Sequence, residues 1–276
     1  MKIQDWSGFA AAALLSGSAL ANHHIMQIQL VIGGVNGDTT AQAIQLRQRF
    51  AGQNIVSAGR LKAFDANGLN PILLIDFTTN VTNALQGDTI LACTNSFKTK
   101  TSPVTVPDFI LTNPIPASYL AAGRITFEFD GGNIWWQLAY GGAAYTGSNT
   151  IDLTNDSDGN AGPPFAQSLT TTGTKAIQYN GAASGASTTN AANYVITAGA
   201  AVVTNNARVS FTVKAACPGD LNSDGFVDDS DFVIFASAYD ALICGPVCPA
   251  DLNNDTFVDD ADFVIFAGAY DALICP

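Results

Sequence analysis

The chain has 276 residues, of which 47% are apolar and 12% are charged, and its formal net charge is −12. This length suits one large domain, or one domain with a small module, and the apolar share is sufficient for a packed core. The acidic balance argues against a nucleic-acid partner, because phosphate binding needs a basic face. No apolar run is long enough to span a bilayer.

Residues 1–21 have the features of a secretory signal peptide. Lys2 precedes a short segment rich in Ala and Leu, and Ala19-Leu20-Ala21 fits the small-residue cleavage motif. Asp5 cancels the charge of Lys2, so an N-terminal apolar strand is the alternative. The signal peptide predicts a secreted or cell-surface protein.

Residues 25–214 predict a β domain. In its first clear strand, residues 43–50, the apolar Ile44, Leu46 and Phe50 alternate with polar side chains, which is the period of a half-buried strand. Many short strands separated by turns rich in Gly, Pro, Asn and Ser are typical of an antiparallel sandwich or barrel.

Two hairpins follow in the same domain. Residues 60–77 predict two strands around an Asn67-Gly68 turn, and residues 125–140 predict two more around a turn at residues 130–133. Long loops are expected between residues 147 and 193. Cys93 has no partner in this domain and is expected to be a buried free thiol that behaves as a small apolar residue.

Catalytic constellations are hard to build from the residues of this domain. The two histidines, His23 and His24, lie at the expected cleavage site, so no Ser-His-Asp or Cys-His arrangement is possible in the mature domain. Glu128, the one glutamate, alternates with phenylalanines and is expected on the solvent side of its strand. We therefore expect a protein that is not an enzyme.

Two features of the β domain are compatible with ligand binding. Trp135 and Trp136 face opposite ways on a strand, so one is expected to fill the core, and the other either to lie there too or to stack on a sugar. Residues 152–160 are rich in Asp and form either a polar turn or a further cation site.

The excess of acid is confined to the last 62 residues. Residues 1–214 hold eleven basic and eleven acidic side chains, whereas residues 215–276 hold twelve Asp and no Lys or Arg. This acidic segment is also a tandem duplication: residues 217–244 and 248–275 align without gaps and are identical at 23 of 28 positions. Its Phe, Val, Ile and Tyr content is too high for a disordered acidic tail.

The first copy begins with DLNSDGFVDDSDF, which has the ligand spacing of an EF-hand calcium loop. Calcium is a hard cation that takes six to eight oxygens, so a short loop must turn several carboxylates inward. The apolar residues that follow recur at helical spacing, at Phe232, Phe235, Ala236 and Tyr239, and predict a helix with one apolar stripe. The expected ligands, with Phe226 acting through its carbonyl, are Asp220, Asn222, Asp224, Phe226, Asp228 and Asp231.

The second copy, DLNNDTFVDDADF, repeats the pattern with one departure. Thr256 stands where the sharp turn of the loop favours glycine, so this site is expected to bind more weakly than the first or to turn differently. The expected ligands, with Phe257 acting through its carbonyl, are Asp251, Asn253, Asp255, Phe257, Asp259 and Asp262. The repeats together predict two calcium ions.

Residues 215–276 resemble a type I dockerin, which has two calcium-loop-and-helix repeats without the entering helix of a full EF-hand. DLNSDGFVDDSDF matches the family motif closely, and DLNNDTFVDDADF lacks its glycine. The resemblance implies a small all-α module that folds on calcium and docks onto a cohesin domain of a scaffold protein or cell surface. Dockerins typically carry polysaccharide-degrading enzymes.

The resemblance also implies which residues meet the partner. They are loop positions 10 and 11 and helix positions 17, 18 and 22 of each copy. In this chain they are Asp229, Ser230, Ala236, Ser237 and Ala241, and then Asp260, Ala261, Ala267, Gly268 and Ala272. The family often has basic residues at positions 17 and 18, where this chain has small neutral ones, so an atypical cohesin or another partner is expected. Because the copies are nearly identical, the module either offers a partner two binding orientations or is a recent duplication without such a consequence.

Four cysteines flank the two repeats, as expected for an oxidising compartment. A helix of about twelve residues is ~18 Å long, so antiparallel helices bring the end of one repeat beside the start of the other. This geometry favours Cys217–Cys275 and Cys244–Cys248, because a disulfide needs close Cα atoms. The alternative pairs are Cys217–Cys244 and Cys248–Cys275.

The β domain resembles lamin-tail-like domains in its strand order. The stretches GGVNGDTTAQAIQLRQRF, LKAFDANG and FEFDGGNIWWQLAYGG carry the resemblance. It implies an immunoglobulin-like sandwich used for binding or attachment in secreted bacterial proteins. The chain is thus expected to be mainly β, with a sandwich at residues 25–214 and an all-α calcium module at residues 215–276.

Three functions are compatible with this organisation. The first is a secreted, non-catalytic protein whose tail docks the sandwich onto a cohesin-like or cell-surface partner. The second is a protein that binds or degrades polysaccharide and is tethered by the same tail. The third is an extracellular structural protein that self-associates.

Overall fold

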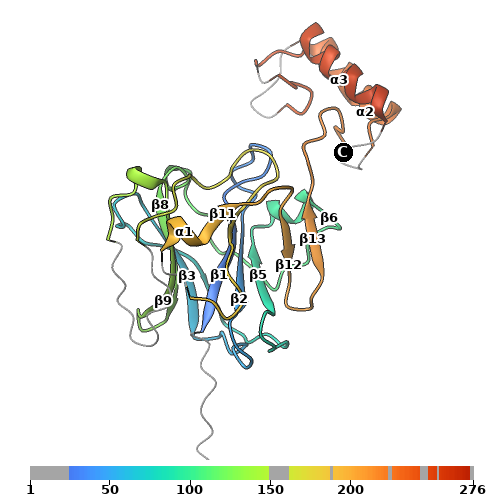
Figure 1. The fold of residues 1–276 in the computed structure, drawn as a ribbon. Coiled ribbons are helices and arrows are strands. Elements are labelled where there is room, and N and C mark those ends of the chain that lie inside the picture. Colours follow the sequence, from blue (N-terminus) through green and yellow to red (C-terminus); the bar gives the residue numbers. More distant parts are fainter. Residues whose placement is uncertain are drawn as a thin grey trace, which may run out of the picture.

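The computed structural model describes residues 25–148, 162–186, 189–222, 226–242, 248–253 and 255–273. Within these residues the protein is mainly β, as the sequence predicts, with three β-sheets and three α-helices (Figure 1). The predicted signal peptide lies outside the described residues. In the part of the chain that is described, no helix has both the length and the apolar character needed to cross a membrane.

The central sheet has six strands in the order β11-β10-β1-β2-β5-β7. Its neighbours pair antiparallel, except that β7 runs parallel to β5. The strands are β1 (Met26–Ile32), β2 (Ala43–Gln48), β5 (Thr89–Cys93), β7 (Phe109–Ile110), β10 (Ile177–Tyr179) and β11 (Tyr194–Ile196).

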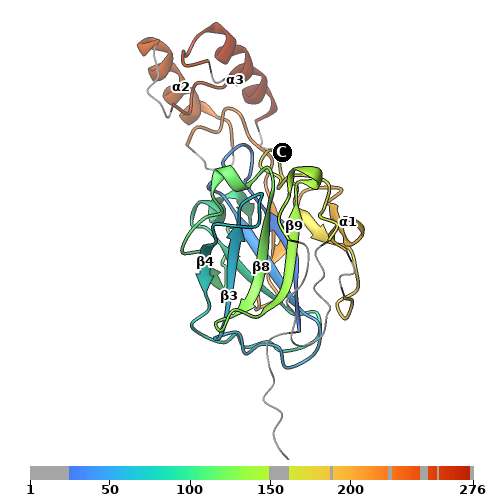
Figure 2. The same cartoon turned by 90° about the vertical axis from the view of Figure 1, so that its left-hand side faces the viewer.

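A four-stranded antiparallel sheet, in the order β4-β3-β8-β9, covers one face of the central sheet and faces the viewer in Figure 2. It consists of the two hairpins that the sequence predicts. The strands are β3 (Gly59–Phe64), β4 (Ile72–Asp76), β8 (Gly123–Phe129) and β9 (Ile134–Tyr140).

A three-stranded antiparallel sheet, in the order β12-β13-β6, covers the other face. Its strands are β6 (Thr101–Ser102), β12 (Val202–Thr204) and β13 (Ser210–Val213). The short helix α1 spans Asn190–Asn193, and single 3-10 turns span Ser96–Lys100, Ala117–Tyr119 and Gly142–Ala144.

The β domain is therefore a three-layer structure, which Figure 1 shows from left to right. The larger hydrophobic core lies between the four-stranded and six-stranded sheets and includes Ile28, Ile44, Phe127 and Trp136. The smaller core lies between the six-stranded and three-stranded sheets and includes Phe211. The sequence predicted a single sandwich, and the third sheet is an addition to it.

The central strands are buried on both faces, so they do not alternate simply between apolar and polar residues. In β5 every residue is buried. In β1 the register shifts between Ile28 and Leu30. Before the shift Met26 and Ile28 lie in the larger core, and after it Leu30 and Ile32 lie in the smaller core while Val31 lies in the larger one. Phe50, which the sequence predicts in the buried set of β2, is exposed because that strand ends at Gln48.

The chain leaves the β domain after β13 and continues into two helices of thirteen residues each, α2 (Asp229–Ala241) and α3 (Asp260–Ala272). Both lie beyond one end of the β-sheets (Figures 1 and 2). Each begins at a capping box, in which the side chain of Asp228 or Asp259 caps the first turn. Three residues further on, the carboxylate of Asp231 or Asp262 accepts a hydrogen bond from the amide of the capping residue. The predicted repeat helices are thus confirmed.

Candidate metal centre

Helices α2 and α3 pack against each other in an antiparallel arrangement. Phe235 and Phe266 stack at the centre with ring centroids 4.9 Å apart. The hydroxyl of Tyr239, near the end of α2, donates a hydrogen bond of 2.5 Å to Asp260 at the start of α3. Reciprocally, Tyr270 donates to Asp229. These carboxylates raise the pKa of both tyrosine hydroxyls, chiefly through the hydrogen bonds.

The two loops repeat the same internal symmetry. The amide of Val227 donates to the carbonyl of Leu273 after α3, and the amide of Val258 donates to the carbonyl of Leu242 after α2, each at 3.4 Å. Each loop therefore packs against the end of the other helix. The duplicated sequence folds into a pair of repeats related by an approximate twofold axis.

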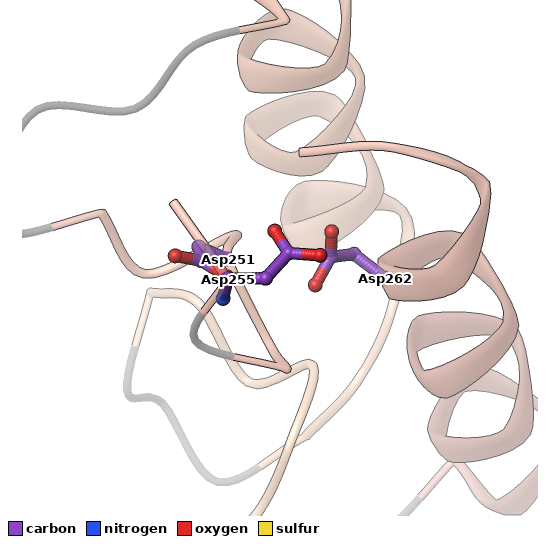
Figure 3. A group of neighbouring side chains, drawn as sticks. All are labelled: Asp251, Asp255 and Asp262. Carbon is purple, nitrogen blue, oxygen red and sulfur yellow. The ribbon is translucent and has the colours of Figure 1, made fainter. Parts of the chain in front are cut away.

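The second loop brings three carboxylates together. Oxygens of Asp251, Asp255 and Asp262 all lie within 4.8 Å of one another. Figure 3 shows the three side chains gathered between the loop and the start of α3. Asp251 and Asp255 come from the loop, whereas Asp262 comes from the first turn of α3. Hard oxygen ligands converging from a short acidic loop suit a divalent cation such as calcium.

Asp262 is the fixed member of this cluster. It is fully buried, and one of its oxygens accepts hydrogen bonds from the amides of Leu252 (2.7 Å) and Asn253 (2.9 Å). Its other oxygen accepts from the amide of Asp259 at 3.0 Å. Because both ends of the loop are tied to this one carboxylate, it positions the loop relative to the helix.

The remaining oxygens of the loop are held by local bonds. Asp251 accepts from the amides of Asp255 (3.1 Å) and Thr256 (2.9 Å). Asp255 accepts from the amide of Phe257 and from the side-chain amide of Asn253, each at 2.9 Å. These bonds tie the side chains of positions 1, 3 and 5 to one another and to the backbone of the loop.

Asp259, at position 9 of the second loop, does not join the three clustered carboxylates. The carboxylate of Asp259 accepts from the amide of Ala261 at 2.8 Å and caps α3, so it is outside the group of three. In EF-hand loops this position often acts through a water molecule. The side chain of Phe257 points to solvent, which is compatible with its predicted role through the main-chain carbonyl.

Thr256 has the backbone that the sequence predicts for position 6. Its φ is +80°, in the left-handed region that a β-branched residue adopts only with strain. The second loop therefore keeps the glycine-type turn in spite of lacking the glycine.

The first loop is described only in part. Asp231 is fully buried, and like Asp262 it accepts from the amides of Leu221 (2.7 Å), Asn222 (3.0 Å) and Asp228 (3.0 Å). Asp228 in turn accepts from the amide of Ser230 and caps α2. The predicted ligand Asp224 lies outside the described residues, so the ligand set of this loop stays a prediction, as do the roles of Asp220 and the carbonyl of Phe226.

The residues predicted to meet a partner are all exposed. They lie at the starts and on the open sides of the two helices: Asp229, Ser230, Ala236, Ser237, Ala241, Asp260, Ala261, Ala267, Gly268 and Ala272.

The sequence interpretation missed the aromatic part of this surface. The predicted apolar stripe consists of Phe232, Phe235, Ala236 and Tyr239, and of these only Phe235 is fully buried. Phe232 is 46% exposed, and its counterpart Phe263 is 45% exposed. The width of the apolar stripe is the signal that could have revealed this exposure. Two short helices that pack only against each other cannot cover all of such a wide apolar surface.

The predicted disulfides involve residues at the edges of the module. Cys217 and Cys248 are partly buried and pack against the small core between the helices. Their expected partners, Cys275 and Cys244, lie outside the described residues, so the pairing stays a prediction. In the β domain, Cys93 is a buried free thiol, as expected, and burial raises its pKa to about 12.

The candidate residues of the β domain are less available than the sequence predicts. Glu128 is buried rather than on the solvent side, because Lys62 (3.1 Å) and Arg60 (3.7 Å) of β3 form ion pairs with it. Trp136 is fully buried and Trp135 is nearly so, which leaves neither ring open for stacking on a sugar. The acidic stretch at residues 152–160 lies outside the described residues.

Comparisons of the chain with protein-family models, with curated proteins and with solved structures gave no match. The resemblances to dockerins and to lamin-tail-like domains therefore rest on the residues quoted above.

Proposed function

We propose that residues 215–276 form a dockerin-like module that binds two calcium ions and docks the β domain onto a cohesin-like domain or another cell-surface scaffold. The observation that carries this proposal is the convergence of Asp251, Asp255 and Asp262 at the register that the sequence motif predicts. The matching bonds around Asp231 support a second site of the same design. The antiparallel, pseudo-twofold pair of helices supports the dockerin resemblance further.

Calcium would be held in the second loop by the three carboxylates, the amide oxygen of Asn253 and the carbonyl of Phe257. The ion supplies positive charge that turns repulsion among clustered carboxylates into attraction. The chain's own part is to fix the buried carboxylate at position 12 and to orient the loop oxygens. Disulfides Cys217–Cys275 and Cys244–Cys248 would clasp the ends of the module.

The β domain is, in this proposal, a non-catalytic binding or attachment domain of a secreted bacterial protein. The four-stranded antiparallel sheet and the six-stranded sheet, which is antiparallel except for β7, pack face to face across the larger core. This packing supports an immunoglobulin-like, lamin-tail-like sandwich to which the third sheet is added. Glu128, the one glutamate of the chain, is engaged by two cations, which supports a structural role for it.

Calorimetry on the full chain tests the metal part of the proposal. Titration of chelator-treated protein with CaCl2 is expected to show two ions bound, with the Thr256 loop the weaker site, and Asp255→Ala is expected to remove one of them. A panel of type I cohesin domains then tests docking, which is expected to require calcium and to disappear in EDTA. The absence of calcium binding heat would contradict the proposal at its base.

A second candidate function, binding of a neutral glycan by the β domain, is favoured by one observation. A polar groove of about 470 Å³ is lined by four glutamines (Gln29, Gln45, Gln86 and Gln178) and by Thr89 and Thr204. Asp88 and Arg208 also line it, and they form an ion pair with each other. Side-chain amides and hydroxyls suit the hydroxyls of a sugar. A glycan array with the full chain tests this function: Gln178→Ala should weaken any hit, whereas Thr212→Ala, an exposed change on β13, should not.

A further inference from the structure

Helices α2 and α3 leave one apolar face uncovered. At its centre are Phe232 and Phe263, each nearly half exposed, while Phe235 and Phe266 behind them are buried. Two apolar grooves of about 440 Å³ each flank the exposed pair, and Phe232 and Phe263 line both of them. An exposed aromatic cluster of this kind is typical of an interaction surface.

The two grooves are equivalent by the internal symmetry of the module. One is completed by Tyr270 with Asp229 and Asp271, and the other by Tyr239 with Asp260 and Asp240. The residues of each groove occupy the same positions of the repeat as the residues of the other. The surface therefore offers the same apolar and acidic environment twice.

The rim of both grooves is acidic without compensation. Asp229 and Asp260 are held at the groove edges by the hydroxyls of Tyr270 and Tyr239. Asp240 and Asp271 are exposed on the opposite walls. Residues 215–276 contain no Lys or Arg to neutralise these four carboxylates.

This charge decides between possible occupants of the face. A second copy of the module would place its own four carboxylates against these four, and like charges brought together at an interface disfavour association. A partner with apolar side chains for the two grooves and Lys or Arg at the rim would satisfy both features. The aromatic centre and polar rim match the anatomy of protein–protein interfaces.

We propose that the Phe232–Phe263 face is the docking surface for a protein partner that presents apolar side chains flanked by basic residues. This inference rests on the proposed calcium-dependent docking and gives the chemistry of the partner. Of the residues predicted to meet a partner, Asp229, Ala236, Asp260 and Ala267 line the grooves, whereas Ser230, Ser237 and Gly268 do not. The inference therefore centres the interface on the phenylalanines.

A pair of matched synthetic peptides tests the charge requirement. Both are amphipathic helices with the same leucine stripe, and one has lysine where the other has glutamate. Fluorescence anisotropy with the full chain in calcium is expected to show binding of the lysine peptide at least roughly tenfold tighter than of the glutamate peptide. Equal affinity for the two peptides would overturn the proposed partner chemistry.

Substitutions distinguish binding at the Phe232–Phe263 face from nonspecific attraction between the acidic protein and a basic peptide. Phe232→Ala with Phe263→Ala keeps the net charge and is expected to weaken the lysine peptide about tenfold or more. The matched control is Val233→Ser with Val264→Ser, on the same helices, at side chains 67% and 71% exposed that line neither groove; it is expected to leave the affinity unchanged. Asp240→Lys with Asp271→Lys should also abolish the preference for lysine without touching the aromatic cluster.

Calcium titration of each variant distinguishes a failure of the proposed calcium-dependent function from a failure of the proposed docking face. If the wild-type chain binds no calcium, the proposed function fails. If every variant binds calcium but the phenylalanine variant keeps its full peptide affinity, this inference alone fails. A calcium-dependent dimer of the wild-type chain that the phenylalanine variant abolishes would also overturn it, by assigning the face to a second copy.

Discussion

The β domain and the C-terminal module hold their folds by different means. The β domain buries apolar side chains on both faces of its central sheet, in two cores that include large residues such as Trp136, Phe127 and Phe211. The fully buried apolar core of the module is limited, within the described residues, to Val227, Phe235, Ala250, Val258 and Phe266. A core this small rarely stabilises a domain alone, which is why modules of this size use metals or disulfides.

Acidic residues have different roles in the β domain and in the C-terminal module. In the β domain, carboxylates such as Glu128 and Asp88 are paired with basic side chains. In the module there are no bases, and the carboxylates are instead held by backbone amides or gathered around the loop. The β domain should therefore be indifferent to calcium, and the module should depend on it.

The largest effect is expected from removing the buried carboxylate of the second loop. Asp262→Ala leaves three amides without their acceptor in a buried site, so the module should lose about 3 kcal/mol or more of local stability. Hydrogen exchange of α2 and α3 measures this loss. Asp271→Asn, an exposed change on the same helix, is the control and should change the same amides by less than about 0.5 kcal/mol.

The matching substitution in the β domain should leave the module intact. Glu128→Gln removes the carboxylate that Lys62 and Arg60 contact, and should destabilise β3 and β8 by roughly 2 kcal/mol because the two cations lose their partner. Exchange of the β-strand amides and of the module amides is compared in one experiment. Loss of protection in α2 or α3 in this variant would contradict the independence of the two regions.

A smaller gain is expected at Thr256. Thr256→Gly relieves the strain of a β-branched residue at φ +80° and should stabilise the loop by about 1 kcal/mol, equivalent to about fivefold tighter calcium binding at this site. Thr256→Ala keeps a Cβ at the same backbone and should gain less. If the glycine variant binds calcium no better, the strain does not limit the site.

The smallest effect concerns a half-exposed ion pair of the β domain. The hydrogen bond from Arg208 lowers the pKa of Asp88, so the pair stabilises the fold above the ordinary pKa of 3.8 and the contribution is lost as the pH falls through the lowered value. Because Arg208 is largely exposed, Asp88→Asn should cost at most about 1 kcal/mol at pH 7. The difference from wild type should shrink toward acid pH, and a constant difference would contradict the assigned charge effect.

The local parts of the fold could be read from the sequence. The hairpins β3–β4 and β8–β9 follow from short turns between alternating residues, and α2 and α3 follow from the helical spacing of apolar residues after each loop motif. The three-layer packing could not, because it depends on pairings between distant segments such as β6 with β13 and β5 with β7. Strands β6 and β7 have two residues each, which is too few for a periodic pattern.

The candidate site could be predicted further than the surfaces around it. The loop spacing predicted Asp251, Asp255 and Asp262 among the ligands, and these three carboxylates converge, since the register of a short loop fixes which side chains come together. The burial of Glu128 and the exposure of Phe232 were missed, because each depends on a neighbouring strand or helix rather than on its own pattern.

Hydrogen exchange of the full chain with and without calcium is the decisive test of whether the C-terminal module folds on the metal. In EDTA, protection of the amides of α2 and α3 should collapse, while protection of β1, β2 and β5 should stay as it is in millimolar CaCl2. Equal protection of α2 and α3 in the two conditions would show that the module folds without the metal, and would contradict the account.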